Sequence, residues 1–333
     1  MRVSLVAFIV SLAVIPSAAQ TQSARKPAPT PRKAWTPPRE ADGRPDLQGI
    51  WANSTLTPLE RPKGFEDKAF FTEAEAPAFE KAVNQGIEAL LGEVELKTSG
   101  EFALEFKGLA PDRRTSLIVD PPNGKIPPLL PDAQRVLDAL IERNTQHPAD
   151  GPEDRNLAER CLLWQNQASP PMLPPPYNQH IQIVQTRQYV MILIEMFHDA
   201  RIIPLDGRPH LPAAMRHWRG DSRGRWEGDT LVVDTRNFAS KNVYDPFDVL
   251  TGSDEALHVI ERFTRVDAST LLYEFTVDDP TAYTKPWSAR IPMTRSNDQI
   301  LEVSCHEENY AMAHILSGAR AEERAAGVSA KKP

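Results

Sequence analysis

The feature that most constrains the fold of this chain is a series of short β-rich runs, separated by short turns, that begins near residue 180. Neighbouring parallel strands need a crossover of about a dozen residues or more, so such turns predict antiparallel neighbours. A long antiparallel sheet tends to curl until its edges are protected. We therefore expect a mainly β fold, an antiparallel barrel or a strongly curved sheet. The predicted strands cover residues 181–185, 189–196, 201–205, 223–227, 230–235, 258–265, 270–277, 287–293 and 300–306.

The residues before this series predict a helical extension on the N-terminal side of the β-structure. Residues 72–95 have the pattern of a helix that Thr72 and Glu75 open with capping-box spacing. Residues 132–145 carry one apolar stripe at helical spacing. Two short strands are predicted at 46–53 and 116–119.

Gly49-Ile50-Trp51 in the first predicted strand resembles the Gly-x-Trp of lipocalin-like barrels, where the Trp closes one end. Longer stretches resemble a large and mostly uncharacterised family of secreted soil-bacterial proteins, from Pro45 to about Glu323. The resemblance implies a lipocalin-like antiparallel barrel and export from the cell, and it implies no particular reaction. The stretches that carry it are residues 207–212, 224–235, 271–280 and 305–310.

The N-terminus has the pattern of a cleavable secretory signal peptide. Arg2 supplies one positive charge, residues 3–15 are apolar, and small residues precede the expected cut. The apolar run is shorter than the roughly 20 residues that a membrane-spanning helix needs, so we expect a periplasmic or secreted protein. The predicted organisation is a signal peptide at 1–19, a Pro-rich linker at 20–45, an N-terminal strand and helical extension at 46–160, an antiparallel β domain at 161–320 and a flexible tail at 321–333.

Composition narrows the range of partners. The formal net charge is −7, and 41% of the residues are hydrophobic. An acidic chain of this kind lacks the clustered Lys and Arg that binding to nucleic acid or to anionic lipid requires. We therefore expect no nucleic acid partner and no membrane insertion, and a small-molecule ligand or substrate instead.

The chain has two cysteines, Cys161 and Cys305. In an oxidising compartment an isolated pair of this kind predicts a disulfide, and the alternative is two buried free thiols. Covalent haem attachment is not indicated, because the Cys-x-x-Cys-His motif is missing from the sequence.

A first group of candidate catalytic residues follows the apolar run at 190–194. Glu195 ends that run, where a buried carboxylate is costly without a partner, and we expect Arg201 or Arg262 to pair with it. His198 follows closely and could exchange protons near neutral pH. The alternative is that the strand has reached solvent and that His198 lies at a turn.

A second group lies beside Cys305. His306, Glu307 and Tyr310 bring an imidazole, a carboxylate and a phenol close together, and such groups can perform general acid–base catalysis. The alternative is a helix start, which an acidic residue such as Glu307 stabilises. We predict that the two groups converge at one end of the β-structure.

Substrate contacts are predicted from Arg201 and Arg262 together with aromatic residues. Trp51 and Tyr273 are expected to line the core or a pocket. Tyr177 belongs to a Pro-rich connector at 169–178, which forms either a lid over the barrel mouth or a surface strap.

Two further patterns carry less weight. Gly220-Asp-Ser222-Arg-Gly224 fits the Gly-x-Ser-x-Gly of a nucleophile elbow, but a β-branched strand follows where a helix is required, so the pattern predicts a hairpin turn. His180, His198 and His306 could be combined with Glu195 into a metal site, but no ligand spacing enforces it, and we expect no cofactor.

The sequence therefore predicts an exported, cofactor-independent acid–base enzyme, a lyase, isomerase or hydrolase, that acts on a small hydrophobic or phenolic molecule. The alternative is a non-catalytic, lipocalin-like protein that binds or carries a small ligand. The two differ in inward charge, because an acid–base enzyme needs converging ionisable groups with displaced pKa values.

Overall fold

The computed structural model of the chain describes residues 35–93, 108–164, 166, 168–240, 243–246, 248–250 and 256–327. The predicted signal peptide, the first part of the predicted linker and the last residues of the predicted tail lie outside the described residues.

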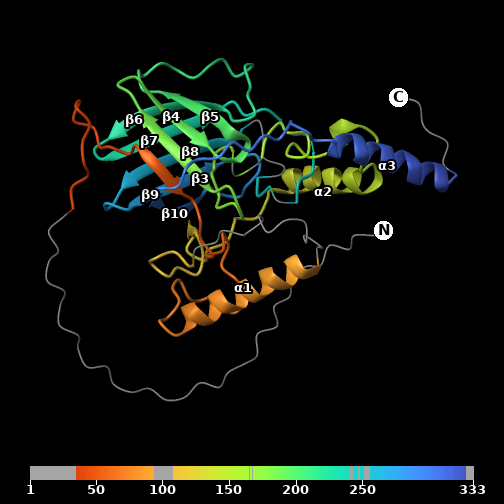
Figure 1. The fold of residues 1–333 in the computed structure, drawn as a ribbon, viewed down its shortest axis with the longest axis horizontal. Coiled ribbons are helices and arrows are strands. Elements are labelled where there is room, and N and C mark those ends of the chain that lie inside the picture. The colour runs from red at the N-terminus through yellow and green to blue at the C-terminus, as the bar shows by residue number, and fades with distance from the viewer. Residues whose placement is uncertain are drawn as a thin grey trace.

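Within the described residues, an antiparallel sheet of ten strands forms the body of the protein (Figure 1). The strand order is β5-β4-β3-β1-β10-β9-β8-β7-β6, and the short β2 pairs with β10 beside this path. The first strand joins two meanders, since Trp51 pairs with Ile181 on one side and with Arg295 on the other. The strands are β1 Gly49–Ala52, β2 Ile118–Asp120, β3 His180–Gln185, β4 Tyr189–Ile194, β5 Asp199–Pro204, β6 Asp221–Glu227, β7 Thr230–Arg236, β8 His258–Arg265, β9 Thr270–Asp278 and β10 Trp287–Ser296.

The two edge strands, β5 and β6, touch through their side chains. Arg201 Nε of β5 donates to Ser222 Oγ of β6 over 3.0 Å. Gly224 of β6 lies so close to β5 that an added Cβ would stand 2.8 Å from Ile203 Cγ2. No backbone ladder joins β5 to β6 within the described strands, so the sheet curves without closing into a barrel. The predicted mainly β, antiparallel fold is thus confirmed, whereas a closed barrel is not formed.

The inner face of the curved sheet holds the hydrophobic core. In β8 and β9 every second residue is buried, as expected for strands with one covered face. Aromatic rings from neighbouring strands pack together: the ring centroids of Phe263 and Tyr273 lie 5.0 Å apart, and those of Phe275 and Trp287 lie 5.6 Å apart. Full burial of one large apolar side chain contributes about 1.5–3 kcal/mol. The interior of the sheet is therefore filled largely by the protein's own side chains.

The helices lie outside the sheet (Figure 1). Beyond one end of it, α2 and α3 run near each other, and Arg320 of α3 donates to the carbonyl oxygens of Ala149 and Asp150 just after α2. The helices are α1 Glu75–Glu93, α2 Pro131–Gln146 and α3 Ala311–Ala325, with single 3₁₀ turns at Pro152–Asp154 and Met196–His198. None of the helices among the described residues is long and apolar enough to cross a membrane.

Both predicted helices of the extension form. The predicted capping box at Thr72 is confirmed, since Glu75 N–H donates to Thr72 Oγ1 over 3.2 Å and Thr72 N–H donates to Glu75 Oε2 over 2.9 Å. The apolar stripe of α2 is largely surface: Val136 and Ile141 are exposed, and Ala133 is the residue that α2 buries.

The described part of the predicted linker packs on the sheet. Pro37 and Pro45 are buried, and Arg39 donates to Asp229 in the β6–β7 turn over 2.8 Å. The guanidinium of Arg265 lies 5.8 Å from the ring centre of Trp35. Residues from Trp35 onward therefore belong to the folded body, earlier in the chain than the expected start near residue 45.

The C-terminal region differs from the prediction in two places. Residues 300–306 form no strand, and the connection from β10 to α3 is irregular. In the predicted flexible tail, α3 continues as far as Ala325.

The predicted disulfide is confirmed. Cys161 and Cys305 are bonded, with their Cα atoms 5.6 Å apart. The bond ties the segment before β3 to the segment that precedes α3.

Candidate acid–base site

His180 and Glu195 stand side by side where β3 begins and β4 ends. The register of this hairpin pairs Ile181 with Ile194, so the next residue of each strand comes to the same level. Glu195 N–H donates to the His180 carbonyl over 3.0 Å, and His180 N–H donates to Glu195 Oε2 over 3.2 Å. His180 Nδ1 lies 3.0 Å from the same carboxylate oxygen. Both residues are buried, at 7% and 2% exposure.

The surroundings of Glu195 keep its carboxylate charged. Burial by itself would raise the pKa of Glu195, but hydrogen bonds from the His180 ring, from Leu301 N–H and from His180 N–H lower it below its usual range. The Leu301 N–H donates to Glu195 Oε1 over 2.9 Å. An ionised carboxylate only accepts hydrogen bonds, so the His180 Nδ1 must carry the proton that it shares with Glu195.

A second carboxylate faces the other side of the His180 ring. Asp298 Oδ2 lies 3.4 Å from His180 Nε2, and the Asp298 side chain is largely exposed. The imidazole therefore has a buried anion at one nitrogen and a solvent-exposed anion at the other. This arrangement holds the ring between two carboxylates, of which the outer one, Asp298, reaches solvent.

A small recess lies beside this pair. Its volume is about 10 Å³, which is room for about one water molecule. Asn53 Nδ2 donates to the Met172 carbonyl over 3.0 Å, whereas the buried Asn53 Oδ1 accepts no hydrogen bond from the described residues. The recess is lined by Asn53, Met172, Leu173, Pro175, Asn178, Gln179, His180, Ile181, Ile194 and Met196.

A larger apolar cleft shares one lining residue, Leu173, with the recess. Its volume is about 310 Å³, and Leu173 lines both hollows. Val83 and Ile87 of α1 form one wall. Clefts of about 300 Å³ or more with mostly apolar walls accommodate small ligands. The cleft is lined by Thr55, Leu56, Thr57, Pro58, Leu59, Val83, Ile87, Leu117, Leu173, Pro174 and Val249.

Of the predicted catalytic residues, Glu195 and His198 both form hydrogen bonds with the backbone of Leu301. His198 is half-buried, and its Nδ1 donates to the Leu301 carbonyl over 3.1 Å, while Leu301 N–H donates to Glu195. His198 and Glu195 therefore both bind Leu301, and His198 lies next to the site.

The other three predicted catalytic residues are exposed. His306 and Glu307 follow the disulfide, and Tyr310 precedes α3 with 66% of its surface accessible. None of the described contacts joins these three side chains to Glu195 or His198. The predicted convergence of the two groups is therefore not supported by a contact.

The predicted partners of Glu195 have other partners. Arg201 points into the interior of the sheet, where it pairs with Glu261. Arg262 lies on the opposite face of β8, half-exposed, and donates to Glu227 over 2.9 Å. The prediction that Arg201 pairs with Glu195 was wrong. Arg201 lies within β5, beyond the turn that follows Glu195.

Trp51 and Tyr273, predicted to contact substrate, are fully buried in the core. Trp51 Nε1 donates to the Leu47 carbonyl over 2.9 Å, and Tyr273 Oη donates to Glu261 Oε1 over 3.0 Å. Tyr177 is partly buried, its ring centre 5.9 Å from that of Trp164, and burial raises its pKa.

The Gly-x-Ser-x-Gly pattern is part of a hairpin. Ser222 lies within β6 and shares hydrogen bonds with Arg201 and Thr235 inside the sheet. The strand and turn context confirms the hairpin interpretation, because the Ser222 hydroxyl is buried and no helix follows. Among the described residues, His, Cys, Asp and Glu form no group of three or more that could hold a metal ion.

The sequence analysis named His180 only as a candidate metal ligand and missed it as an acid–base residue. The sequence did contain evidence for this role: the three-residue turn between β3 and β4 fixes their register, and extending that register by one residue places His180 beside Glu195.

Comparison of the chain with family models, with curated proteins and with solved structures finds no match.

Proposed function

We propose that this protein is an exported, cofactor-independent acid–base enzyme that acts on a small, largely apolar molecule bearing a hydroxyl group, such as a phenol. The observation that carries the proposal is the buried pair of His180 and Glu195 beside a recess that offers a hydrogen-bond acceptor. The secreted soil-bacterial family that the sequence resembles is consistent with export.

In this proposal His180 moves the proton. Glu195 holds the Nδ1 proton and stabilises the charged ring, so that proton exchange takes place at Nε2. The exposed Asp298 near Nε2 relays protons between the ring and solvent. Lyases, isomerases and hydrolases all use an imidazole in this way.

The two hollows support the choice of substrate class. The apolar body of the substrate would occupy the cleft, and its hydroxyl would reach past Leu173 into the recess. There the hydroxyl could donate to Asn53 Oδ1, which accepts no hydrogen bond from the described residues. A polar group placed in this way offsets the cost of the unpaired buried acceptor.

The test begins with a fluorescent phenol, 2-naphthol, titrated into the full chain. Leu173→Trp adds bulk at the residue that lines both hollows and should weaken binding by about tenfold or more, equivalent to about 1.4 kcal/mol. Ile202→Trp is the matched control, because Ile202 is exposed at 53% on the outside of β5. Equal binding by both variants and the unchanged protein would contradict the substrate site.

Catalysis is tested separately, on small molecules that copurify with the protein and are identified by mass spectrometry. Incubation of the purified protein with each of them should convert at least one, and His180→Gln should stop the conversion. The apolar cleft also supports the carrier alternative. Unchanged ligand after incubation, with binding intact, would favour the carrier.

A further inference from the structure

The irregular connection after β10 covers the acid–base site. We call residues 297–305 the covering segment. Its Leu301 N–H donates to Glu195, its Leu301 carbonyl accepts from His198, and its Asp298 carboxylate faces His180. A segment without regular structure therefore supplies three of the polar groups that surround the site.

Packing alone holds the covering segment weakly. The Leu301 side chain is 60% exposed, so the residue that contacts Glu195 through its backbone is not anchored by its own side chain. Val303 is half-buried against the core. At its end, the covering segment is held covalently, through Cys305.

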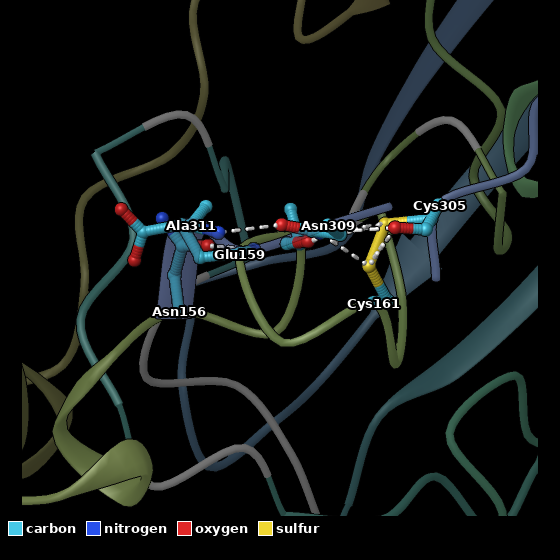
Figure 2. Close-up of a disulfide and its surroundings, with 7 residues drawn as sticks. Asn156, Glu159, Cys161, Cys305, Asn309 and Ala311 are labelled. Atoms are coloured by element: carbon cyan, nitrogen blue, oxygen red, sulfur yellow. Dashed lines mark hydrogen bonds between the residues drawn. A yellow bond between two sulfur atoms is a disulfide. The ribbon is translucent and has the colours of Figure 1, made fainter. Parts of the chain in front are cut away.

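The disulfide also connects the covering segment to α3. Asn309 lies between the disulfide and Ala311, the first residue of α3 (Figure 2). Its Nδ2 donates to the Cys305 carbonyl over 2.9 Å and lies 3.1 Å from Cys161 Sγ. Its Oδ1 accepts from Ala311 N–H over 3.0 Å. The end of the covering segment is thus fixed to two parts of the protein at once.

We propose that the Cys161–Cys305 disulfide positions the Leu301 N–H on Glu195 and makes the acid–base site sensitive to reduction. The inference rests on the proposed function only for the identity of the site that it controls. With the bond intact, the covering segment stays on the site. Reduction removes the covalent anchor, and the covering segment opens to solvent while the sheet stays folded.

Opening changes the chemistry of the site. The Leu301 hydrogen bond is one of the contacts that lower the pKa of Glu195. When that donor leaves, the pKa of Glu195 rises, the carboxylate holds the His180 ring less firmly, and proton transfer slows.

A dithiol reduces the bond by two successive thiol–disulfide exchanges. Its thiolate attacks Cys305 Sγ, the bond between the two protein sulfurs breaks, and Cys161 leaves as a thiolate that takes up a proton. The second thiol of the reductant then displaces Cys305, which leaves as a thiol while the reductant becomes a disulfide. The Asn309 amide beside Cys161 Sγ stabilises the departing thiolate, which makes Cys161 the leaving group.

Hydrogen exchange of the oxidised chain and of the chain reduced with dithiothreitol tests the proposal. Reduction should lower the protection of the Leu301 amide by about tenfold or more beyond any change at the β8 and β9 amides. The titration of Glu195, followed by carboxylate NMR, should move to higher pH. The double variant Cys161→Ser, Cys305→Ser should show the opened state without reductant and should not respond to it.

Equal protection of Leu301 before and after reduction would overturn the proposal. A loss of protection in β8 and β9 as large as that at Leu301 would also overturn it, because the bond would then hold the whole fold and not the covering segment in particular. Neither readout requires a substrate, so failure of the proposed enzyme activity is distinguishable from failure of this inference.

Discussion

Arg201 and Glu261 form a buried ion pair that ties β5, one edge of the sheet, to β8, the third strand from the other edge. Arg201 Nη1 of β5 donates to Glu261 Oε1 of β8 over 3.0 Å, and both side chains are buried. Arg201 also donates to Ser222 over 3.0 Å and to Thr235 over 3.1 Å, and Tyr273 donates to Glu261 over 3.0 Å. Both charges of this pair are thus matched by partners, and their contacts connect β5, β6, β7, β8 and β9 inside the curved sheet.

Replacing Glu261 by Gln should lower the free energy of unfolding by about 3–5 kcal/mol, because it leaves the buried Arg201 charge without its counter-charge. Arg262→Ala is the control. Arg262 is the next residue of β8, but it lies half-exposed on the opposite face, where ion pairs contribute little. Urea denaturation near neutral pH measures both variants. Equal losses for the two would contradict a structural role for the buried pair.

Gly224→Ala should destabilise the protein by about 1–3 kcal/mol, because the new methyl group overpacks the contact between β5 and β6. Its Cβ would stand 2.6 Å from Leu205 Cδ2 and 2.8 Å from Ile203 Cγ2. Gly318→Ala in α3 is the matched control, since no atom lies within 4 Å of the Cβ position there. That variant should gain about 0.5–1 kcal/mol from helix propensity. Thermal unfolding of the two variants checks the difference, and a neutral Gly224→Ala would mean that the strands are not in contact.

The carboxylate of Asp234, on the outer face of β7, should make the stability of the fold decrease in acid. Asp234 Oδ2 lies 2.9 Å from His258 Nε2, and Asp234 Oδ1 lies 2.8 Å from His210 Nε2 and 3.1 Å from Arg236 Nε. Burial would raise the pKa of Asp234, but His258 and Arg236 lower it well below its usual range. A lowered carboxyl pKa stabilises the fold fully above the pKa of the unfolded chain, about 3.9. This stabilisation is lost as the pH falls from about 4.

Asp234→Asn should therefore reduce the steepness of the stability loss between about pH 5 and about pH 2. Urea midpoints at several pH values measure this slope. Asp229→Asn, in the exposed β6–β7 turn, should keep the slope of the unchanged protein. An unaltered slope in Asp234→Asn would show that this carboxylate does not carry the effect.

The local pattern predicted the strands, because alternation and turns are properties of neighbouring residues. The predicted strand at 258–265 matches β8 residue for residue. The strand predicted at 300–306 failed for a non-local reason. It follows β10, whose neighbours are already β9 on one side and β1 and β2 on the other, so no strand position beside β10 is open to it.

The site could be predicted only as far as local register reaches. Glu195 was found because a carboxylate at the end of an apolar run needs a partner, and the turn register points to His180 as that partner. Arg201 and Glu261 meet only because the sheet curves across several strands, and no local pattern contains that curvature. Leu301 contributes its backbone N–H, which every residue type except Pro could supply, so its side chain carries no signal.

Substitutions of His180, in the buried site, and of His306, beside the disulfide, should have opposite effects on catalysis. His180→Gln should lower kcat/KM by about 10²–10⁴-fold on the substrate identified by copurification, which is the usual effect of removing a general acid–base group. His306→Gln should leave kcat/KM unchanged, because the His306 side chain is exposed and no described contact links it to Glu195. The second variant is a close control, since it alters an imidazole next to Cys305 without breaking the disulfide. Circular dichroism should show both variants folded. If His306→Gln lost activity while His180→Gln kept it, the catalytic group would lie beside the disulfide and the His180–Glu195 site would be wrong.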